Sequence, residues 1–337
     1  MQLTTTHVFT IAERGERGGE IRFVCGANPE GEITTFAEHD GHNGGPINVP
    51  VDVTPAAFLL ERVASRSGGD ADDLARAAAF VAGVEKRHEA IQRFETLAGR
   101  LAAKMRLSQT PVPGFIMGLS GTDSILAFLV TYEAAKAMGM AARVLGIHYV
   151  QRDRRKPSWF ERDLVPWLRE RCPEATILVD TPFGGNHDQL RWADLHMRAL
   201  NEVSANSYGD AVLVPYDKGL NYWVVGCQNL TEQELGKYSA MSEKVSVAPI
   251  RKVWKSKVIE MCEALDVPAI AVEYSRLPDC LCGRDDIAAN NIELIDAILT
   301  HQVKVGEHDP ELLDMMFAYV RDLKKENGFK QRTPYLL

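Results

Sequence analysis

The spacing of apolar positions changes twice along this chain of 337 residues. Up to residue 54, short runs alternate between apolar and polar positions, and clusters of Gly, Asn and Asp separate them. Alternation with a period of two, bounded by turn-forming residues, is typical of antiparallel strands. From Pro55 to about Met105 the spacing becomes helical, with a break at SRSGGDADD. We therefore expect a small β-rich region with a helical linker over residues 1–110, with strands at 7–12, 20–25, 32–36 and 47–53.

A different pattern begins near Pro113, where strand-like runs alternate with helical ones. This order is typical of βαβ units and predicts a doubly wound parallel sheet over residues 111–337. Such sheets bind ligands at the carboxyl ends of their strands, beside the point where the strand order reverses. The expected strands are 114–119, 143–150, 175–181, 210–214 and 222–227, and the expected helices are 123–138, 158–171, 188–206, 230–241 and 254–265.

Composition narrows the function classes. A net charge of −8 argues against a general surface for nucleic acid or membranes, and no run reaches the roughly eighteen apolar residues of a membrane span. The N-terminal stretch lacks the order of a signal peptide, so we expect a cytoplasmic protein. Six scattered cysteines in that setting indicate reduced thiols rather than a disulfide framework.

The stretch GFIMGLSGTDSILAFLV, residues 114–130, joins a buried strand to a helix N-terminus through a turn of small and hydroxyl residues. Free N–H groups and the positive end of the helix dipole at such a turn favour a phosphate. A plain strand–helix connection, capped by Ser120 or Asp123, explains the turn equally well. A Walker A loop, a dinucleotide fingerprint and a nucleophile elbow are all excluded, because the required Lys, third Gly or flanking Gly is missing.

The turn resembles the S-G-G-x-D-S pyrophosphate loop of the N-type ATP pyrophosphatases, which include NAD synthetase, GMP synthetase and asparagine synthetase. A second stretch, residues 223–258, resembles the NAD synthetase branch in particular. Its matching features are Gly226, Asn229, Thr231 and Glu232 in a G-T-x-N-x-[ST]-E pattern, the pair Lys237-Tyr238, and the spacing from Pro249 to Lys255. The resemblance covers residues 113–301 and implies a Rossmann-like fold of the ATP-pyrophosphatase type.

This chain departs from the family pattern at several points. The loop is one residue shorter, because only Thr122 lies between Gly121 and Asp123, and Cys227 replaces the usual Thr. Ser239 and Ala240 replace the Gly-Asp after Tyr238, and the stretch LPDCLCGRDD is shorter than the family's acidic loop. The shorter loop concerns the phosphate end. The other changes lie where NAD synthetases handle their substrate, so we expect that the ATP chemistry is kept and that the acceptor differs.

The resemblance implies a ligase that uses ATP and Mg²⁺. A small carboxylate would attack the α-phosphorus of ATP, pyrophosphate would leave, and ammonia or an amine would take the acyl group to form an amide. The nitrogen source would be free ammonia, an amine or a separate amidotransferase subunit, because residues 1–110 are too few for a glutaminase domain. We expect a homodimer.

The same resemblance assigns candidate roles to individual residues. The expected catalytic residues are Asp123, Lys237 and Lys255; the nucleotide-binding residues are Gly118, Ser120, Gly121, Thr122, Ser124, His148 and Thr231; the substrate residues are Arg198 and Asn229; and the Mg²⁺ ligands are Asp123 and Glu232. For four of these residues, a purely structural role is an alternative to the functional one. Lys255 could cover a helix face, Lys237 could be solvated, His148 could be a packed core residue, and Thr231 could cap a helix with Glu234.

Two other functions stay open. The spacing Cys280-x-Cys282 could serve a sulfur-inserting enzyme of the same fold, although two ordinary thiols in an active-site loop explain it as well. A third reading is a nucleotide-binding protein whose shortened loop no longer catalyses a reaction.

Overall fold

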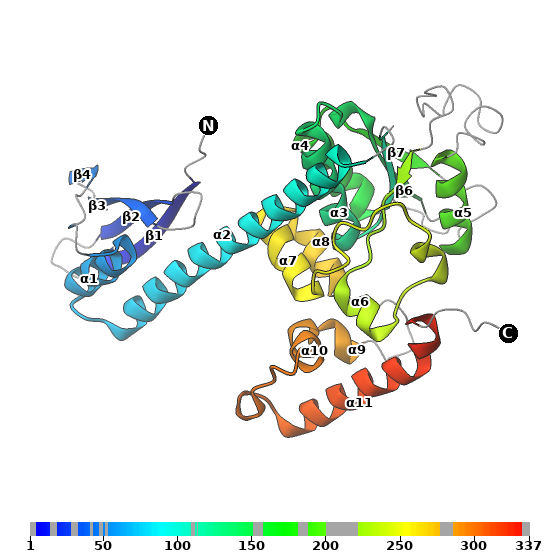
Figure 1. Ribbon diagram of the computed structural model, residues 1–337. Coiled ribbons are helices and arrows are strands. Elements are labelled where there is room, and N and C mark those ends of the chain that lie inside the picture. Colours follow the sequence, from blue (N-terminus) through cyan, green and yellow to red (C-terminus); the bar gives the residue numbers. More distant parts are fainter. Residues whose placement is uncertain are drawn as a thin grey trace. The chain divides into compact units, whose positions relative to one another are not determined.

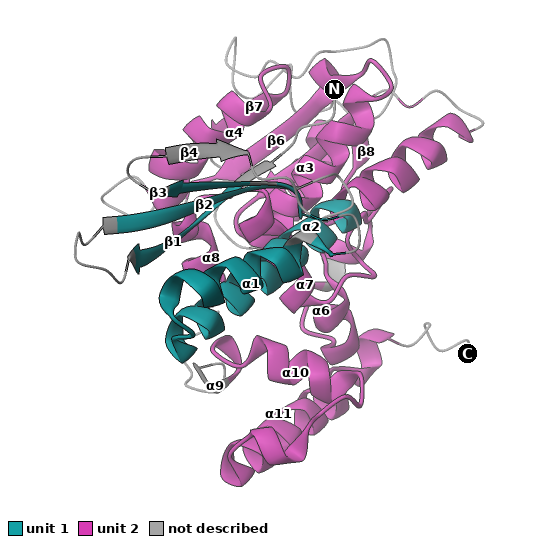
Figure 2. Cartoon of the chain, turned by 90° about the vertical axis from the view of Figure 1, so that its left-hand side faces the viewer, with its two compact units in different colours: residues 1–93 teal, residues 94–337 magenta. Residues whose placement is uncertain are grey.

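The chain divides into two compact units, residues 1–93 and 94–337 (Figure 2). This division falls inside helix α2 (Ala71–Arg106), whereas the sequence pattern places a boundary after that helix, at residue 110. The computed structural model describes residues 5–13, 19–27, 33–40, 43–46, 50, 53–108, 112, 114–150, 158–180, 188–199, 222–276 and 286–331.

Unit 1 is a four-stranded antiparallel meander with helices packed on it. Its strands are β1 (Thr5–Glu13), β2 (Gly19–Ala27), β3 (Ile33–Asp40) and β4 (Asn43–Pro46), in that order. Helix α1 (Pro55–Ser67) begins at the Thr54 cap and ends at Gly68, whose φ of 66° suits glycine. Apolar residues from β1, β2, α1 and α2 form one core. The expected fourth strand, 47–53, falls mostly outside the described residues.

Unit 2 contains the expected parallel sheet. Four strands lie in the order β7-β6-β5-β8, and all neighbouring pairs are parallel. They are β5 (Phe115–Leu119), β6 (Val144–Tyr149), β7 (Thr176–Asp180) and β8 (Trp223–Val224). The doubly wound α/β fold is therefore confirmed, while the expected strand 210–214 lies outside the described residues.

Helices cover both faces of this sheet (Figure 1). Helix α3 (Thr122–Lys136) packs on β5 and β6, and α4 (Val165–Arg171) packs on β7. Helix α5 (Asp188–Ala199) packs on β5 and β8 from the other side. The remaining helices are α6 (Leu230–Leu235), α7 (Lys255–Ala264), α8 (Ala269–Ser275), α9 (Asp286–Ala289), α10 (Ile292–Leu299) and α11 (Pro310–Asn327).

Two expected helices differ from the structure. The predicted helix 230–241 ends at Leu235, because Gly236 adopts a φ of 65° that terminates α6. The predicted helix 158–171 contains a π-helical turn, Phe160–Leu164, before α4. Among the helices that the structure describes, none is long and apolar enough to span a membrane.

Strand β5 places the loop of residues 118–124 at the position where doubly wound sheets bind their ligands. Phe115, Ile116 and Met117 are fully buried, so the strand lies in the centre of the sheet. Its neighbours are β6 on one side and β8 on the other, so the strand order reverses at β5. The turn that follows Leu119 therefore opens at the switch point of the sheet.

We predict that Gly114→Ala lowers the free energy of unfolding of the protein by about 1–3 kcal/mol, because the site has no room for a methyl group. A Cβ atom there would lie 2.0 Å from Cε1 of Tyr222 and 2.7 Å from the carbonyl oxygen of Arg143. Gly99→Ala is the matched control, since nothing lies within 4 Å of its Cβ position inside α2. That change should raise stability by about 0.5–1 kcal/mol. Equal denaturant midpoints for the two variants would contradict this packing.

Candidate functional site

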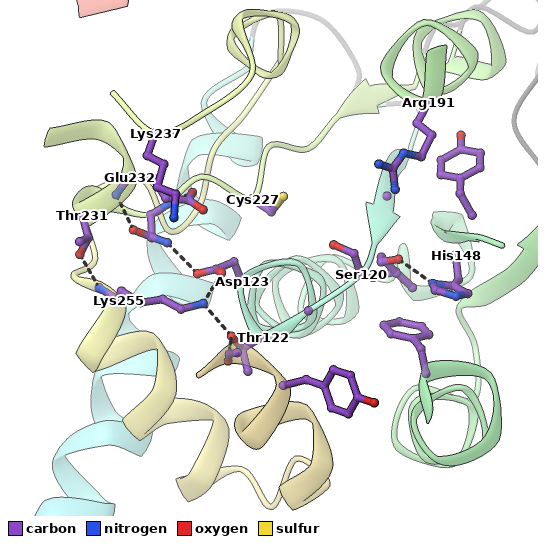
Figure 3. Close-up of a pocket in the computed structure, with 18 of the residues that line it drawn as sticks. Ser120, Thr122, Asp123, His148, Arg191, Cys227, Thr231, Glu232, Lys237 and Lys255 are labelled. Atoms are coloured by element: carbon purple, nitrogen blue, oxygen red, sulfur yellow. Dashed lines mark hydrogen bonds and ion pairs between the residues drawn. The ribbon is translucent and has the colours of Figure 1, made fainter. Parts of the chain in front are cut away.

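A cavity of about 550 Å³ opens at the carboxyl ends of β5 and β6 in unit 2 (Figure 3). This volume is in the range of about 300–1,000 Å³ that small-molecule sites occupy. The N-terminal turn of α3 forms its floor, and α5, α6, α8 and the first residue of α7 contribute side chains to its walls. Nine of the predicted nucleotide-binding and catalytic residues line it, together with the predicted substrate residue Asn229 and the predicted metal ligand Glu232; the nine are Gly118, Ser120, Gly121, Thr122, Asp123, His148, Thr231, Lys237 and Lys255.

The short loop is held closed by one of its own side chains. The hydroxyl of Ser124 accepts hydrogen bonds from the N–H groups of Ser120 (2.7 Å) and Gly121 (3.1 Å), and it donates to the carbonyl of Gly121 (2.8 Å). Ser124 is buried, so the structure gives it a loop-stabilising position rather than the expected phosphate contact. The N–H groups of the first helical turn have no acceptor within their own helix, so those of Thr122 and Asp123 are the loop's donors for an anion.

Lys255 and Asp123 form an ion pair in the floor of the cavity. The ammonium of Lys255 donates to a carboxylate oxygen of Asp123 and to the hydroxyl of Thr122 at 2.9 Å (Figure 3). The two charged side chains are only 14% and 19% exposed. Residues 132 positions apart in the sequence therefore meet where a phosphate loop needs positive charge. The alternative role of Lys255, in which its side chain only covers a helix face, does not fit this geometry.

Asn229 links the two acidic residues that the sequence assigns to Mg²⁺. Its Nδ2 donates to Asp123 (2.9 Å), its Oδ1 accepts from the N–H of Glu232 (2.9 Å), and its own N–H donates to the Glu232 carboxylate (3.3 Å). Asn229 thus caps α6 with Glu232 in a capping box. The expected cap formed by Thr231 with Glu234 is wrong, because Asn229 occupies the cap position.

Asp123 and Glu232 fit a magnesium ion that phosphate oxygens help to hold. Both line the cavity and both contact Asn229, so their carboxylates face the same space. Within the described ranges, no group of three or more His, Cys, Asp and Glu side chains could hold a metal by itself. Mg²⁺ in nucleotide sites needs only one or two protein carboxylates, since phosphates and water supply its other ligands.

Aromatic side chains line the end of the cavity that lies away from Lys237 (Figure 3). Nδ1 of His148 donates to the carbonyl of Leu119 (2.9 Å), and the His148 ring stacks on Phe160 with centroids 4.1 Å apart. Trp159 packs on Tyr274 with centroids 4.8 Å apart. Flat apolar faces of this kind suit a nucleobase. His148 is therefore at the predicted nucleotide end, whereas the sequence pattern did not single out Trp159, Phe160 or Tyr274.

Burial and charge shift the pKa values of two groups in the cavity. Burial lowers the pKa of Lys255, but the adjacent Asp123 and the more distant Glu232 outweigh it, so that the net pKa is raised and the ammonium stays charged. Burial, with the nearby charges of Glu232 and Asp123, raises the pKa of Cys227 to about 12. A thiol in this state is a weak nucleophile. Cys280 and Cys282 lie outside the described residues.

The structure places Arg191, and not the expected Arg198, in the lining of the cavity. Arg198 is fully buried, and its guanidinium donates to Asp194 (2.8 Å) and Asp180 (2.8 Å), which ties α5 to β7. Arg191 lies two helical turns earlier on α5, lines the cavity and directs its guanidinium into it (Figure 3). The seven-residue spacing places both on one helix face, a signal that the sequence contained but that did not tell which one reaches the cavity.

The resemblance to N-type ATP pyrophosphatases implies a phosphate loop at a strand end with Lys255, Asp123 and Glu232 beside it. The structure brings these three residues together around one cavity and adds the ion pair between Lys255 and Asp123. No family model matches the chain. An NH3-dependent NAD⁺ synthetase from Coprothermobacter proteolyticus is 35% identical over 137 residues, which are 38% of this chain and 45% of the relative. The chain thus spans less than half of the curated relative that it matches.

Among the solved structures that share the fold are two that match with a TM-score of at least 0.50. They are an NH3-dependent NAD synthetase from Campylobacter jejuni, in complex with the nitrate ion (TM-score 0.50, 17% identity), and an NMN synthetase from Francisella tularensis (TM-score 0.52, 15% identity). Each match covers 74% of this chain and 98% of the other. The resemblance to the NAD synthetase-like branch of the N-type ATP pyrophosphatases is confirmed.

We predict that Arg198→Met destabilises the protein by about 3–5 kcal/mol, because it leaves the buried carboxylate of Asp194 without its cation. Arg191→Met, the same change two turns away on α5, should lower stability by no more than about 0.5 kcal/mol. Urea unfolding of both variants provides the comparison. Similar losses in the two variants would show that Arg198 is not the structural arginine.

Proposed function

We propose that the protein is an ATP-dependent ligase that forms AMP and pyrophosphate. It adenylates a small carboxylate and transfers the acyl group to ammonia or an amine. The observation that carries this proposal is the cluster of Lys255, Asp123 and Thr122 at the N-terminus of α3, where a cation, a carboxylate and helix N–H groups converge. Sequence similarity to an NAD synthetase supports it.

We propose one orientation for ATP in the cavity. Its phosphates would lie over the loop, close to Lys255 and Lys237, and its adenine would lie at the aromatic end near His148 and Phe160. Asp123 and Glu232 would hold Mg²⁺ together with phosphate oxygens. When bound, the ion would neutralise charge that develops on the leaving pyrophosphate.

The reaction would proceed in two substitutions. A carboxylate oxygen of the acceptor attacks the α-phosphorus, the bond from that phosphorus to the bridging oxygen breaks, and pyrophosphate leaves with its electron pair. Lys255 and the N–H groups of α3 stabilise that anion, and one preorganised donor of this kind contributes about 3–4 kcal/mol. Ammonia or an amine then attacks the acyl carbon, loses a proton and displaces AMP.

Arg191 is the residue that we assign to the acceptor carboxylate, in place of Arg198. It enters from α5, at the opposite end of the cavity from Lys237 (Figure 3). Arginine is suited to this task, because its planar guanidinium binds a carboxylate through two parallel hydrogen bonds. We propose that the nitrogen source is free ammonia, an amine or a separate amidotransferase subunit, and that the enzyme is a cytoplasmic homodimer.

A screen for ATP–pyrophosphate exchange tests the proposal. Small carboxylates are added one at a time to the protein with MgATP and labelled pyrophosphate, and a competent acid makes label enter ATP. We expect exchange without any nitrogen donor, because adenylation precedes amide formation. Nucleotide binding with no exchange for any acid would favour a non-catalytic nucleotide-binding protein instead.

We predict that Asp123→Asn lowers kcat by about 10²-fold or more, since the change removes one hard oxygen ligand and the partner charge of Lys255. The fold should persist, because Asn keeps the volume and one acceptor oxygen. Asp322→Asn, an exposed site in α11, is the control for the same chemical change. Turnover of Asp123→Asn that matches this control would place the metal elsewhere.

We predict that nicotinic acid adenine dinucleotide is a poorer acceptor than some smaller carboxylate. The stretches that follow Lys237 and Pro278 differ from the NAD synthetase pattern, and each donor lost to a dinucleotide costs about 1–3 kcal/mol. Two or three such losses lower kcat/KM by orders of magnitude. A kcat/KM for the dinucleotide and ammonium of about 10⁴–10⁸ M⁻¹s⁻¹ would identify the protein as an NAD synthetase instead.

A further inference from the structure

One buried carboxylate beside the site has no part in the reaction described so far. Asp296 lies in α10, is 5% exposed, and is the acid of the otherwise apolar segment LIDAIL. Burying a carboxylate is costly unless hydrogen bonds compensate it. Helix α10 packs on α6 and α7, so the partners of Asp296 lie on the two helices that carry Thr231 and Lys255.

Asp296 accepts two hydrogen bonds, one on each oxygen. The hydroxyl of Thr231 donates to Oδ1 (2.5 Å), and the backbone N–H of Ser256 donates to Oδ2 (2.9 Å). The backbone N–H of Lys255 in turn donates to the hydroxyl oxygen of Thr231 (2.9 Å). A chain of hydrogen bonds therefore runs from Asp296, directly and through Thr231, to the first two residues of α7.

These bonds provide the cap that α7 lacks in its own sequence. Its N-cap residue is Trp254, and that side chain makes no capping hydrogen bond. Helices need acceptors for their first N–H groups, and a Ser, Thr, Asp or Asn at the N-cap usually supplies one. Here the acceptors come from α6 and α10 instead. The start of α7, and with it Lys255, is thus fixed by residues that are distant in the sequence.

The same bonds restrict what Thr231 can do. Its hydroxyl has one proton, which it donates to Asp296, and a lone pair of its oxygen accepts from Lys255. The hydroxyl proton is therefore not directed at a phosphate. Burial raises the pKa of Asp296, and the hydrogen bonds from Thr231 and Ser256 offset part of this effect.

We propose that Asp296 is a positioning residue of the adenylation site. It orients Thr231 and caps α7, and this arrangement holds the ammonium of Lys255 against Asp123 and Thr122. The inference rests on the proposed function for its catalytic consequence, but its structural step concerns the protein without nucleotide.

Amide hydrogen exchange of the nucleotide-free protein tests the structural step. In Asp296→Ala the N–H groups of Lys255 and Ser256 should exchange about tenfold faster or more, because the change removes one acceptor and releases the other. Asp309→Ala is the matched control, since Asp309 caps its own helix, α11, through Glu311 and Leu312. Unchanged exchange at Lys255 and Ser256 in Asp296→Ala would overturn the proposal, whatever reaction the protein catalyses.

A double-mutant cycle tests the catalytic step. Asp296→Asn and Thr231→Val should each lower the kcat of ATP–pyrophosphate exchange by about 10- to 100-fold with a smaller change in the KM for ATP, because each loosens Lys255, which acts on the leaving group. If both act through one chain, the double variant should be no more than about 2- to 3-fold worse than the worse single variant.

Independent effects on kcat, which multiply in the double variant, would contradict the proposal. So would wild-type turnover in Asp296→Asn. Absence of exchange in the wild-type protein with every acid would refute the proposed function and leave the hydrogen-exchange test of Asp296 valid.

Discussion

The site depends on the ion pair between Lys255 and Asp123, which joins the N-terminal turns of α7 and α3. Two charges that are mostly removed from water need each other and further hydrogen bonds, because an unpaired charge there would cost several kcal/mol. Thr122 and Asn229 supply those bonds. The fold meets this constraint by bringing the loop after β5, the start of α6 and the start of α7 to one edge of the sheet.

The sequence predicted the elements at this edge of the sheet well, because the patterns that indicate them are local in the chain. Strand β5, the turn after it and α3 are contiguous between Phe115 and Lys136, so this one stretch predicts a strand, a turn suited to an anion and a helix without knowledge of the rest. The parallel sheet follows from the alternation of strands and helices, since parallel strands need crossover helices. Asp123, Thr231, Glu232 and Lys255 line one cavity, as the motif order leads one to expect.

What the sequence could not predict depends on distant contacts. The spacing on α5 marks both Arg191 and Arg198, but only tertiary structure shows that Arg198 is buried against Asp180 while Arg191 reaches the cavity. The hydroxyl of Ser124 turns back on the loop and accepts hydrogen bonds from the N–H groups of Ser120 and Gly121, which the loop sequence alone does not reveal. Asp296 offered a usable signal, an acid within the apolar run LIDAIL, yet its partners lie 40 and 65 residues away.

Helix caps and an ion pair fix the phosphate end of the site, whereas the sequence of the proposed acceptor end differs from the NAD synthetase pattern. We propose that this site directs attack to the α-phosphorus of ATP. Phosphorus NMR of the products, with an acid that supports exchange and with ammonium present, tests this direction of attack. We expect AMP and pyrophosphate in equal amounts, one of each for every acyl group transferred; ADP and orthophosphate as the stoichiometric products would refute it.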